Sequence, residues 1–257
     1  MNFDRKHVPA ALQKFFAEHP QVALAFSGGC DSAYLYYAAR ACGADIYAYY
    51  VRSQFQPAFE LADALRLAPD MKIIELDVLA DARVRENPAG RCYFCKRAIL
   101  SAILSTARAD GFACVIDGTN ASDDASDRPG MRALREMQIL SPLRECGVTK
   151  AQVRELSGNA GLFTWNKPAY ACLATRIPAG VAIEEEMLRR VERAEAALTA
   201  LGFSDFRVRM QGNAARLELT AAGMSMLMER REQVLSALEE DFDEVVMDLR
   251  PRKGMEI

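Results

Sequence analysis

Four short apolar runs in the first half of the chain constrain its fold more than any other feature. They are VALAF (22–26), IYAYYV (46–51), MKIIEL (71–76) and ACVIDG (113–118). Strands that are buried on both faces carry such near-continuous runs. Helix-like segments lie between them, at 32–41, 58–67 and 93–109. This alternation predicts an α/β fold in which a parallel sheet is flanked by helices.

A different pattern begins in the last third of the chain. Residues 184–200 predict a charged helix, and a Met-rich segment predicts another helix at 221–239. Three strands are predicted at FRVRM (206–210), ARLELT (215–220) and EVVMDL (244–249). This order predicts a small antiparallel sheet with helices on one face. We therefore expect a larger domain of residues 1–180 and a smaller α+β domain of residues 181–257.

Two segments between these regions have distinct patterns. SDDASDRPGMRA (122–133) is rich in Ser, Asp, Pro and Gly, which predicts an irregular loop. VTKAQVRELSGNAG (148–161) predicts a helix whose first turn is capped by Thr149.

Composition and charge limit the kinds of partner. The net charge of −3 and the isoelectric point near 5.6 argue against a large nucleic-acid surface, which needs a basic face. No apolar run approaches the ~20 residues that span a bilayer. The amphipathic N-terminal segment, broken by Pro9, does not have the pattern of a signal peptide. We expect a cytoplasmic protein, and the odd number of scattered cysteines, seven, argues against a disulfide framework.

The segment AFSGGCDS (25–32) leaves the first predicted strand and enters a helix. Gly28 and Gly29 permit a tight turn, and Ser27 and Ser32 add hydroxyl donors, so the loop and the helix N-terminus form an anion nest suited to phosphate. Asp31 would repel a bare phosphate, which is consistent with a Mg²⁺ ion between them. The spacing is neither that of a Walker A loop nor that of a dinucleotide fingerprint. The alternative is a plain strand-to-helix turn that Asp31 caps.

Three cysteines stand in unusual settings. Cys92 and Cys95 form a C-x-x-C in GRCYFCKRAIL, and Cys172 lies in the segment TWNKPAYACLATRIP. Lys167 and Arg176 are close to Cys172 in sequence, and positive neighbours favour the thiolate that attacks or binds metal.

Three interpretations of these cysteines stay open. A structural zinc site would need a fourth ligand, and neither His7 nor His19 has ligand spacing. A redox couple would use Cys92 and Cys95 without a distant third cysteine. Three thiolates would suit a [4Fe–4S] cluster with one iron open for exchangeable sulfur.

The second domain offers two arginines on one strand face. Arg207 and Arg209 share a face because side chains in a strand repeat every two residues. Paired guanidinium groups suit phosphate or carboxylate binding, and the alternative is a solvated face paired with glutamates. The other cysteines are predicted to be packing residues: Cys30, Cys42, Cys114 and Cys146.

Six motifs occur in an order that resembles the LarE family. They are SGGCDS, NPAGRCYFCK (87–96), DGTNASD (117–123), RPGMRAL (128–134), SPL (141–143) and KPAYACLATRIP (167–178). The first resembles the phosphate loop of the N-type ATP pyrophosphatases, the PP-loop superfamily, whose fold is of the adenine nucleotide alpha hydrolase type. The resemblance covers roughly the whole chain.

The resemblance implies an ATP-dependent sulfur transferase. Such enzymes adenylate a carboxylate of a nicotinate-derived mononucleotide and convert it to a thiocarboxylate, in the biosynthesis of the nickel-pincer nucleotide of lactate racemase. ATP and Mg²⁺ are then required, with Asp31 acting through the metal ion. The implied ATP-binding residues are Ser27, Gly28, Gly29, Asp31, Ser32, Gly118 and Thr119.

The resemblance also assigns the sulfur centre. In that family the cysteine at the position of Cys172 carries the sulfur, and members with that cysteine alone give up their own sulfur. Members that also carry the C-x-x-C are thought to hold a [4Fe–4S] cluster, here on Cys92, Cys95 and Cys172. Substrate contacts are implied for Arg176, Arg207 and Arg209, and a divalent metal for Glu195, which could equally form a surface salt bridge. Family members form hexamers, so we expect a homo-oligomer that binds a small nucleotide and neither nucleic acid nor membrane.

Two rival functions remain. A tRNA thiolase of the PP-loop superfamily would share the ATP loop and often the cluster, but it needs a basic RNA surface. A non-enzymatic ATP-binding regulator on the same scaffold would bind ATP without releasing pyrophosphate, and it would leave the three cysteines unexplained.

Overall fold

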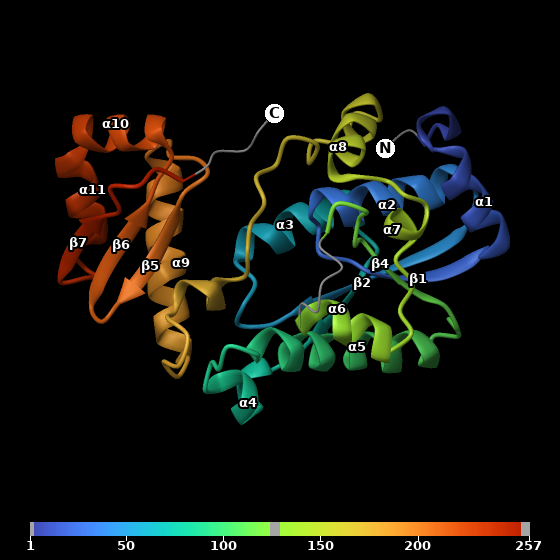
Figure 1. Cartoon of the computed structure of the whole chain (residues 1–257), viewed down its shortest axis with the longest axis horizontal. Helices are drawn as coiled ribbons and strands as arrows, with labels where there is room; N and C mark the ends of the chain where they lie inside the picture. Colours follow the sequence, from blue (N-terminus) through green and yellow to red (C-terminus); the bar gives the residue numbers. More distant parts are fainter. Residues whose placement is uncertain (1–2, 124–128, 253–257) are drawn as a thin grey trace. The chain divides into compact units, whose positions relative to one another are not determined.

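The chain forms two compact units. The computed structural model describes residues 3–123 and 129–252 (Figure 1). The first unit comprises Met1–Ser53, Ala58–Val78 and Gly90–Ala169. The second comprises Gln54–Pro57, Leu79–Ala89 and Tyr170–Ile257, so it includes two short segments from the first half of the chain. The domain boundary expected near residue 180 stays a prediction.

A four-stranded parallel sheet forms the centre of the first unit. Its order is β3-β2-β1-β4, with β1 at Gln21–Ala25, β2 at Asp45–Arg52, β3 at Lys72–Glu75 and β4 at Val115–Asp117. These strands coincide with the four apolar runs, and the predicted parallel sheet is confirmed. All the carboxyl ends of the strands therefore lie at one edge of the sheet. Burial on both faces is wrong for β3, because β3 is an outer strand of the sheet and its Ile73 is 39% exposed.

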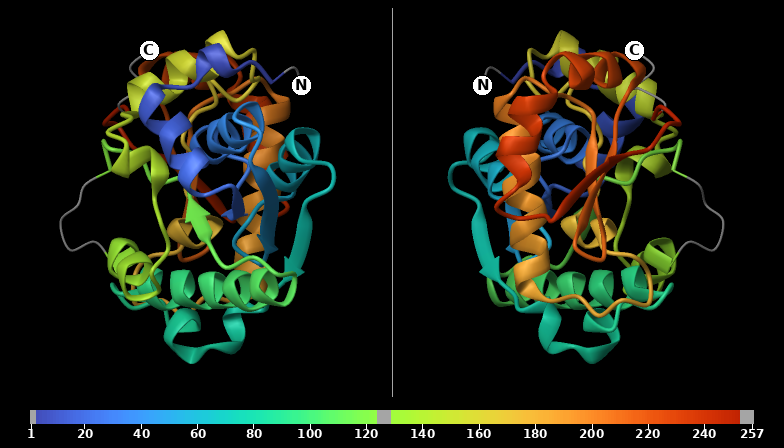
Figure 2. Two further views of the ribbon diagram at one scale, coloured as in Figure 1. Left: turned by 90° about the vertical axis from the view of Figure 1, so that its right-hand side faces the viewer. Right: turned by 90° about the vertical axis from the view of Figure 1, so that its left-hand side faces the viewer.

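Helices cover both faces of this sheet. The helical segments are η1 (Arg5–His7), α1 (Ala10–Glu18), α2 (Cys30–Ala41), α3 (Ala58–Leu67), α5 (Arg91–Ala109), α6 (Pro129–Glu136), α7 (Pro142–Glu145) and α8 (Lys150–Asn159). Helices α5 and α6 lie on one face, and α1, α2 and α8 lie on the other (Figure 2). The irregular loop predicted at 122–133 is helical from Pro129 onward, and residues 124–128 lie outside the described residues.

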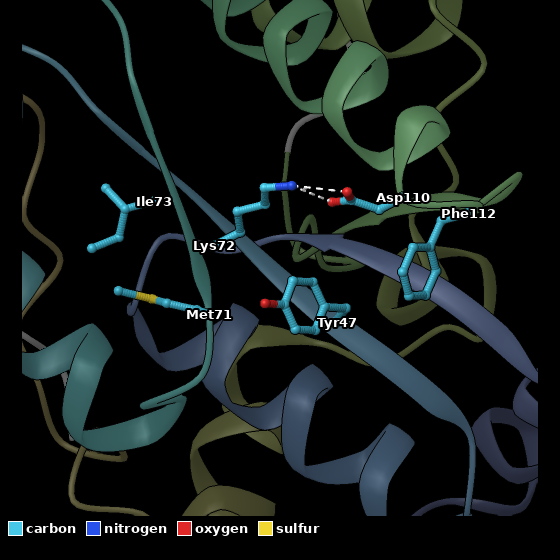
Figure 3. A pocket seen from close by; sticks show the side chains of 6 residues that line it. All are labelled: Tyr47, Met71, Lys72, Ile73, Asp110 and Phe112. Atoms are coloured by element: carbon cyan, nitrogen blue, oxygen red, sulfur yellow. Dashed lines mark hydrogen bonds and ion pairs between the residues drawn. The ribbon is translucent and has the colours of Figure 1, made fainter.

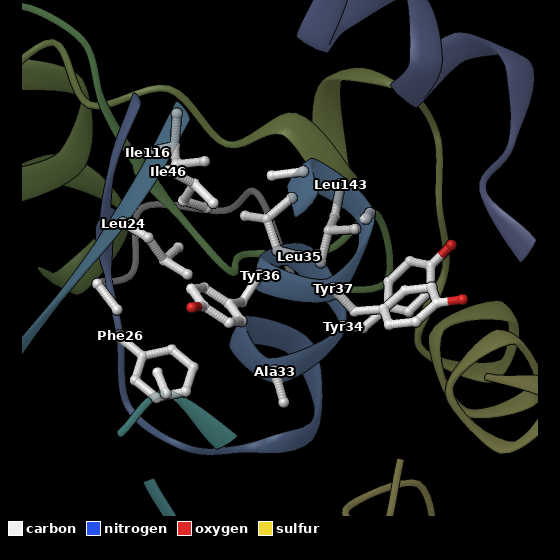
Figure 4. Close-up of a cluster of buried hydrophobic side chains, with 14 of the residues drawn as sticks. Leu24, Phe26, Ala33, Tyr34, Leu35, Tyr36, Tyr37, Ile46, Ile116 and Leu143 are labelled. Carbon is white, nitrogen blue, oxygen red and sulfur yellow. The ribbon is translucent and has the colours of Figure 1, made fainter. Parts of the chain in front are cut away.

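Helix α2 lies in the hydrophobic core of the first unit. It is buried over most of its length, and Leu35 packs with Leu24 and Leu143 in the core (Figure 4). The hydroxyl of Tyr34 donates to the carbonyl of His7 at 2.8 Å, and the hydroxyl of Tyr37 donates to the carbonyl of Asp4 at 3.0 Å. Because these contacts fix the position of α2, they also fix the loop that leads into it.

The second unit contains a three-stranded sheet of order β5-β6-β7. Its elements are α4 (Ala82–Arg85), which follows the short turn η2 (Val78–Ala80), then η3 (Leu173–Arg176), α9 (Glu185–Ala200), β5 (Arg207–Gln211), β6 (Ala214–Glu218), α10 (Ala221–Glu229), α11 (Arg231–Leu238) and β7 (Glu244–Met247). The predicted antiparallel sheet is wrong in one pairing, because β5 and β6 are antiparallel whereas β6 and β7 are parallel. The segment with α10 and α11 crosses over and returns the chain in the same direction.

The helix predicted at 221–239 is two helices. Arg230 leaves helical dihedral angles between α10 and α11, with φ −112° and ψ 20°. Its guanidinium donates to the carbonyl of Leu201 at 2.5 Å, which holds the break in place. In the described parts of the chain, no helix has both the length and the apolar character to cross a membrane.

Candidate functional site

The segment after β1, residues 26–29, is the turn for which phosphate binding is predicted; with the first residues of α2, up to Ser32, it is called the phosphate loop below. Strand β1 ends at Ala25 and α2 begins at Cys30, with Gly29 at the N-cap. Gly28 has a φ of +71°, and a Cβ there would come within 2.9 Å of the Cβ of Ala64 on α3. Only glycine therefore fits this turn. No side chain caps α2, so the alternative in which Asp31 caps the helix is wrong.

The two serines of the loop face each other. Their hydroxyl oxygens lie 3.1 Å apart, and the hydroxyl of Ser27 accepts from the amide of Gly29 at 3.3 Å. The hydroxyl of Ser32 accepts from the amide of Ser27 at 3.3 Å. These contacts hold the turn together at the N-terminus of α2, where the predicted anion nest would lie.

The end of β4 passes directly against this loop. A Cβ on Gly118 would come within 2.9 Å of the backbone nitrogen of Ser32, so glycine is required for the close approach. Beside it, Asp117 accepts from the hydroxyl of Thr119 at 2.6 Å and from the hydroxyl of Ser141 at 2.6 Å. The ammonium of Lys96 lies 3.7 Å from the same carboxylate. The DGTN segment is thereby fixed beside the phosphate loop.

Sequence reasoning missed the cation of this site. Lys150, the first residue of α8, donates to the carboxylate of Asp31 at 2.6 Å. The side-chain amide of Asn120 donates to the other oxygen of Asp31 at 3.4 Å. Thr149 caps α8 in a capping box with Gln152, which fixes the start of the helix and with it Lys150. From sequence alone, the VTK motif (148–150) predicts a helix start, and nothing in the motif indicates that Lys150 contacts Asp31.

The C-x-x-C lies in the first two turns of α5. Cys92 is exposed and Cys95 is buried, and no disulfide is present among the described residues. Gly90 is the N-cap and gives no side-chain cap. In residues 3–123 and 129–252, no three His, Cys, Asp or Glu side chains gather closely enough to hold a metal ion. Cys92 and Cys95 belong to the first unit and Cys172 to the second.

The four cysteines predicted to be packing residues have that character. Cys30 is buried among core residues, 3.8 Å from the hydroxyl of Ser157, and burial raises the pKa of its thiol. Cys42 and Cys146 follow α2 and α7. Cys114 is half-buried and directly precedes β4, so its predicted place inside a buried strand is wrong by one residue. Burial also raises the pKa of these three thiols.

In the second unit, Arg176 organises the loop that carries Cys172. Its side chain is fully buried, and one of its Nη atoms donates to the carbonyl of Ala171 at 2.8 Å and to the hydroxyl of Thr175 at 2.9 Å. Its Nε donates to the carboxylate of Glu195 at 2.8 Å. The structure thus gives Arg176 a positioning role, and its contact with substrate stays a prediction.

Glu195 is a buried ion-pair partner. Its two oxygens accept from Arg176, from the amide of Val208 at 3.0 Å and from the hydroxyl of Tyr170 at 2.5 Å. Of the two roles expected for it, this geometry favours the salt bridge, although in the interior and not on the surface. A divalent metal would have to displace these donors.

Arg207 and Arg209 differ in their surroundings. Arg207 is buried, with its guanidinium 5.3 Å from the ring centroid of Tyr170. Burial, together with the nearby cations Arg176 and Arg252, lowers the pKa of Arg207. Arg209 is partly exposed and donates to Glu218 at 2.6 Å and to the carbonyl of Thr175 at 2.5 Å. The cationic strand face predicted from the sequence is therefore next to the Cys172 loop.

An open depression of about 520 Å³ lies elsewhere on the first unit (Figure 3). It is lined by Tyr47, Met71, Lys72, Ile73, Asp110 and Phe112, which lie towards the amino ends of the strands or just before them. Lys72 donates to both oxygens of Asp110 at 2.8 Å, which with the hydroxyl of Tyr49 lowers the pKa of that carboxyl. Ligands of open α/β sheets bind beyond the carboxyl ends, so we assign this depression no part in the site.

The fold and the loop define the class of the protein. A parallel sheet whose first strand leads through Ser-Gly-Gly-x-Asp-Ser into a buried helix is an α/β architecture of the PP-loop type.

Comparison with known proteins identifies the family. No protein-family model matches the chain. A pyridinium-3,5-bisthiocarboxylic acid mononucleotide synthase of Lactiplantibacillus plantarum is 32% identical over 249 residues, which cover 93% of this chain and 90% of that protein. An uncharacterised protein of Synechocystis sp. is 38% identical over 213 residues, 81% of this chain and 80% of the relative. Another, of Methanocaldococcus jannaschii, is 25% identical over 236 residues, 90% of each. The chain belongs to the LarE family, that of the Lactiplantibacillus synthase.

Proposed function

We propose that this chain is an ATP-dependent sulfur transferase that converts a carboxylate of a nicotinate-derived mononucleotide into a thiocarboxylate, in the biosynthesis of the nickel-pincer nucleotide of lactate racemase. The family supports the substrate and the reaction. The observation that carries the ATP chemistry is the convergence of Asp31, Lys150 and the DGTN segment on one phosphate loop.

The loop residues suit adenylation. The loop and the N-terminus of α2 would bind the pyrophosphate part of ATP, and Asp31 would hold a Mg²⁺ ion that offsets the phosphate charge. Mg²⁺ would replace Lys150 at Asp31, and the released ammonium would face the phosphates. A carboxylate oxygen of the substrate attacks the α-phosphorus, and the bond to the β-phosphate oxygen breaks. The products are an acyl-adenylate and pyrophosphate.

Sulfur then displaces AMP. A sulfur nucleophile attacks the acyl carbon, and the bond to the AMP oxygen breaks. Hydrosulfide would give the thiocarboxylate directly. A cysteine thiolate would give a thioester, and the thiocarboxylate would leave only when the Cβ–S bond of that cysteine breaks with loss of its α-proton, so that dehydroalanine remains. The sulfur would be either that of Cys172 or hydrosulfide supplied through a [4Fe–4S] cluster, which Cys92, Cys95 and Cys172 would hold. Thiolates are the ligands that such clusters use, and Cys92 and Cys95 fit because they stand three residues apart on α5 without a disulfide. When bound, a cluster with three protein ligands would supply an iron that carries exchangeable sulfide.

The second unit would bind the nucleotide substrate. Arg207 and Arg209 stand on one strand face, and guanidinium groups bind phosphate in a bidentate manner. We propose a homo-oligomer, as in the family, and a cytoplasmic location, where thiols stay reduced.

The test is an anaerobic assay with ATP, Mg²⁺, hydrosulfide and nicotinate-derived dicarboxylate mononucleotide. We expect AMP, pyrophosphate and thiocarboxylate in equal amounts, and none of them from Asp31→Ala, which should stay folded. ADP with phosphate would contradict the α-phosphate chemistry. Binding of ATP without turnover would favour the non-enzymatic regulator, and turnover that requires tRNA would favour the thiolase.

A further inference from the structure

The loop that carries Cys172 is held at its backbone. The carbonyl of Cys172 accepts from the amide of Thr175 at 3.0 Å and from its hydroxyl at 2.8 Å, which closes the turn η3. The amide of Leu173 donates to the carbonyl of Phe55 at 2.9 Å. Leu173 and Ala174 are buried, whereas Cys172 is half-buried. The position of the thiol therefore depends on contacts that hold this turn.

One of these contacts comes from the cationic strand. A terminal nitrogen of Arg209 donates to the carbonyl of Thr175 at 2.5 Å, while its Nε donates to Glu218 at 2.6 Å. The far end of η3 is thus tied to β5 through a residue that we propose as a phosphate ligand. Arg209 keeps about a third of its side chain exposed, 35%, so a ligand can reach it.

A phosphate and the Thr175 carbonyl would compete for Arg209. A phosphate group offers a guanidinium two hydrogen bonds in which both partners are charged, whereas the carbonyl of Thr175 offers it one uncharged acceptor. Buried Arg207, two residues earlier on the same face, adds a second cation. A bidentate phosphate would therefore draw Arg209 away from the turn.

We propose that Arg209 is a positioning residue that couples substrate to sulfur: occupation of the Arg207/Arg209 site by a phosphate group releases the carbonyl of Thr175 and frees the Cys172 loop. This inference rests on the proposed role of these arginines in binding the nucleotide phosphate. The reaction would then follow a fixed order: the nucleotide binds first, and the sulfur centre becomes reactive only afterwards.

The experiment measures alkylation of Cys172 by iodoacetamide in the reduced, metal-free full-length protein. Peptide mass spectrometry follows Cys172, with exposed Cys92 as internal reference, in inorganic phosphate and in chloride of equal ionic strength. In the wild type, phosphate should speed labelling of Cys172 by roughly threefold to tenfold, the range that loss of one hydrogen bond permits. An unchanged or slower rate in phosphate would overturn the proposal.

Matched variants assign the effect to one contact. Arg209→Gln should label Cys172 fast in both buffers, and Arg209→Lys, which keeps one charged donor, should retain part of the phosphate response. Arg216→Gln is the control, because Arg216 lies opposite Arg209 in the β5/β6 register and pairs with Asp248 instead of the turn. A phosphate response that survives in Arg209→Gln, or is lost in Arg216→Gln, would contradict the role of Arg209. Alkylation needs neither ATP nor AMP formation, so failure here is distinguishable from failure of the proposed function.

Discussion

Gly118 has no room for a side chain, because the phosphate loop passes 2.9 Å from where its Cβ would lie. The contact is with the backbone of Ser32, which cannot move without opening the first turn of α2. Gly118→Ala should therefore reduce the free energy of unfolding by about 1–3 kcal/mol, the usual cost of overpacking. It should also weaken ATP binding. Urea unfolding and calorimetric titration with ATP measure the two effects.

Gly158 offers the control for that substitution. It lies inside α8, and an added Cβ would meet the ring of Trp165 at an ordinary 3.8 Å. Gly158→Ala should be neutral or gain about 0.5–1 kcal/mol, because alanine loses less backbone entropy in a helix. If both variants lost the same free energy of unfolding, the close approach at Gly118 would not be the cause of the loss.

The pair of Arg176 and Glu195 is the second residue-scale test. Their side chains are 0% and 7% exposed, so removal of one partner leaves a buried charge. Arg176→Met should lower the free energy of unfolding by about 3–5 kcal/mol, as for other broken buried pairs. Arg189→Gln, which breaks an exposed pair with Glu185, should cost at most about 0.5 kcal/mol. Chemical denaturation compares them, and similar midpoints would contradict the structural role of Arg176.

Site residues could be predicted from the sequence when they lie next to one another in the chain, and not when they meet only in the folded structure. The phosphate loop was recognisable because Ser27 to Ser32 are consecutive. Lys150 was not, because its partner Asp31 is far away in sequence and only the packing of α8 on α2 brings the two together. Burial of Arg176 and Glu195 was hidden for the same reason, since charged residues in a helix and a loop have the pattern of a solvated surface.

At the scale of elements, Thr149 caps helix α8, and the position of Lys150 at the phosphate loop depends on that cap. Its side chain accepts from the amide of Gln152, and the next residue is Lys150, the partner of Asp31. Thr149→Ala should cost about 1 kcal/mol of stability, as for other lost caps, and should weaken ATP binding because α8 frays at Lys150. Thr220→Ala removes the cap of α10 in the other unit and should lose similar stability with unchanged ATP binding. An ATP effect in both variants would contradict the link.

The parallel sheet could be predicted because each of its strands lies in a near-continuous run of apolar residues. The small sheet was half predicted: alternation in FRVRM and ARLELT gives strands, and a two-residue connection between β5 and β6 makes them antiparallel. The direction of β7 depends on how α10 and α11 lie, and Arg230 fixes the break between them through a tertiary contact. No local pattern carries that information.

For the whole molecule, the buried thiols predict a loss of stability in alkali. Burial raises the pKa of Cys30, Cys42, Cys114 and Cys146. An unfolded thiol titrates near about pH 8.5, so above that pH the unfolded chain releases protons that the folded chain keeps. The four thiols therefore contribute fully to the free energy of unfolding below about pH 8.5. This contribution is lost as the pH rises through the pKa values that the thiols have in the folded chain.

The measurement is the urea midpoint between about pH 7 and pH 10 under reducing conditions. We expect a decline from about pH 8.5, and a shallower one in the variant with both Cys30→Ala and Cys114→Ala. A midpoint that stays constant up to about pH 10 would contradict the prediction.

The three-cysteine hypothesis also belongs to the whole molecule, because its ligands come from both units. Replacement of Cys92, Cys95 or Cys172 by Ala should each abolish the reconstituted cluster, measured as iron, sulfide and visible absorbance under anaerobic conditions. Each should also abolish multiple turnover with added hydrosulfide. If the chain loses the mass of one H₂S during turnover, Cys172 has been consumed and the cluster hypothesis is wrong.

The division of the chain has a consequence for its synthesis. The carbonyls of Phe55, Arg85 and Asn87 accept from the amides of Leu173, Ile183 and Gly180, which leave the ribosome about a hundred residues later. The segments 54–57 and 79–89 therefore emerge long before the unit to which they belong exists. The three carbonyls therefore lack their native donors until the last third of the chain is made. No single cut separates the two units, so a fragment that starts at residue 170 would lack segments 54–57 and 79–89 of its own unit.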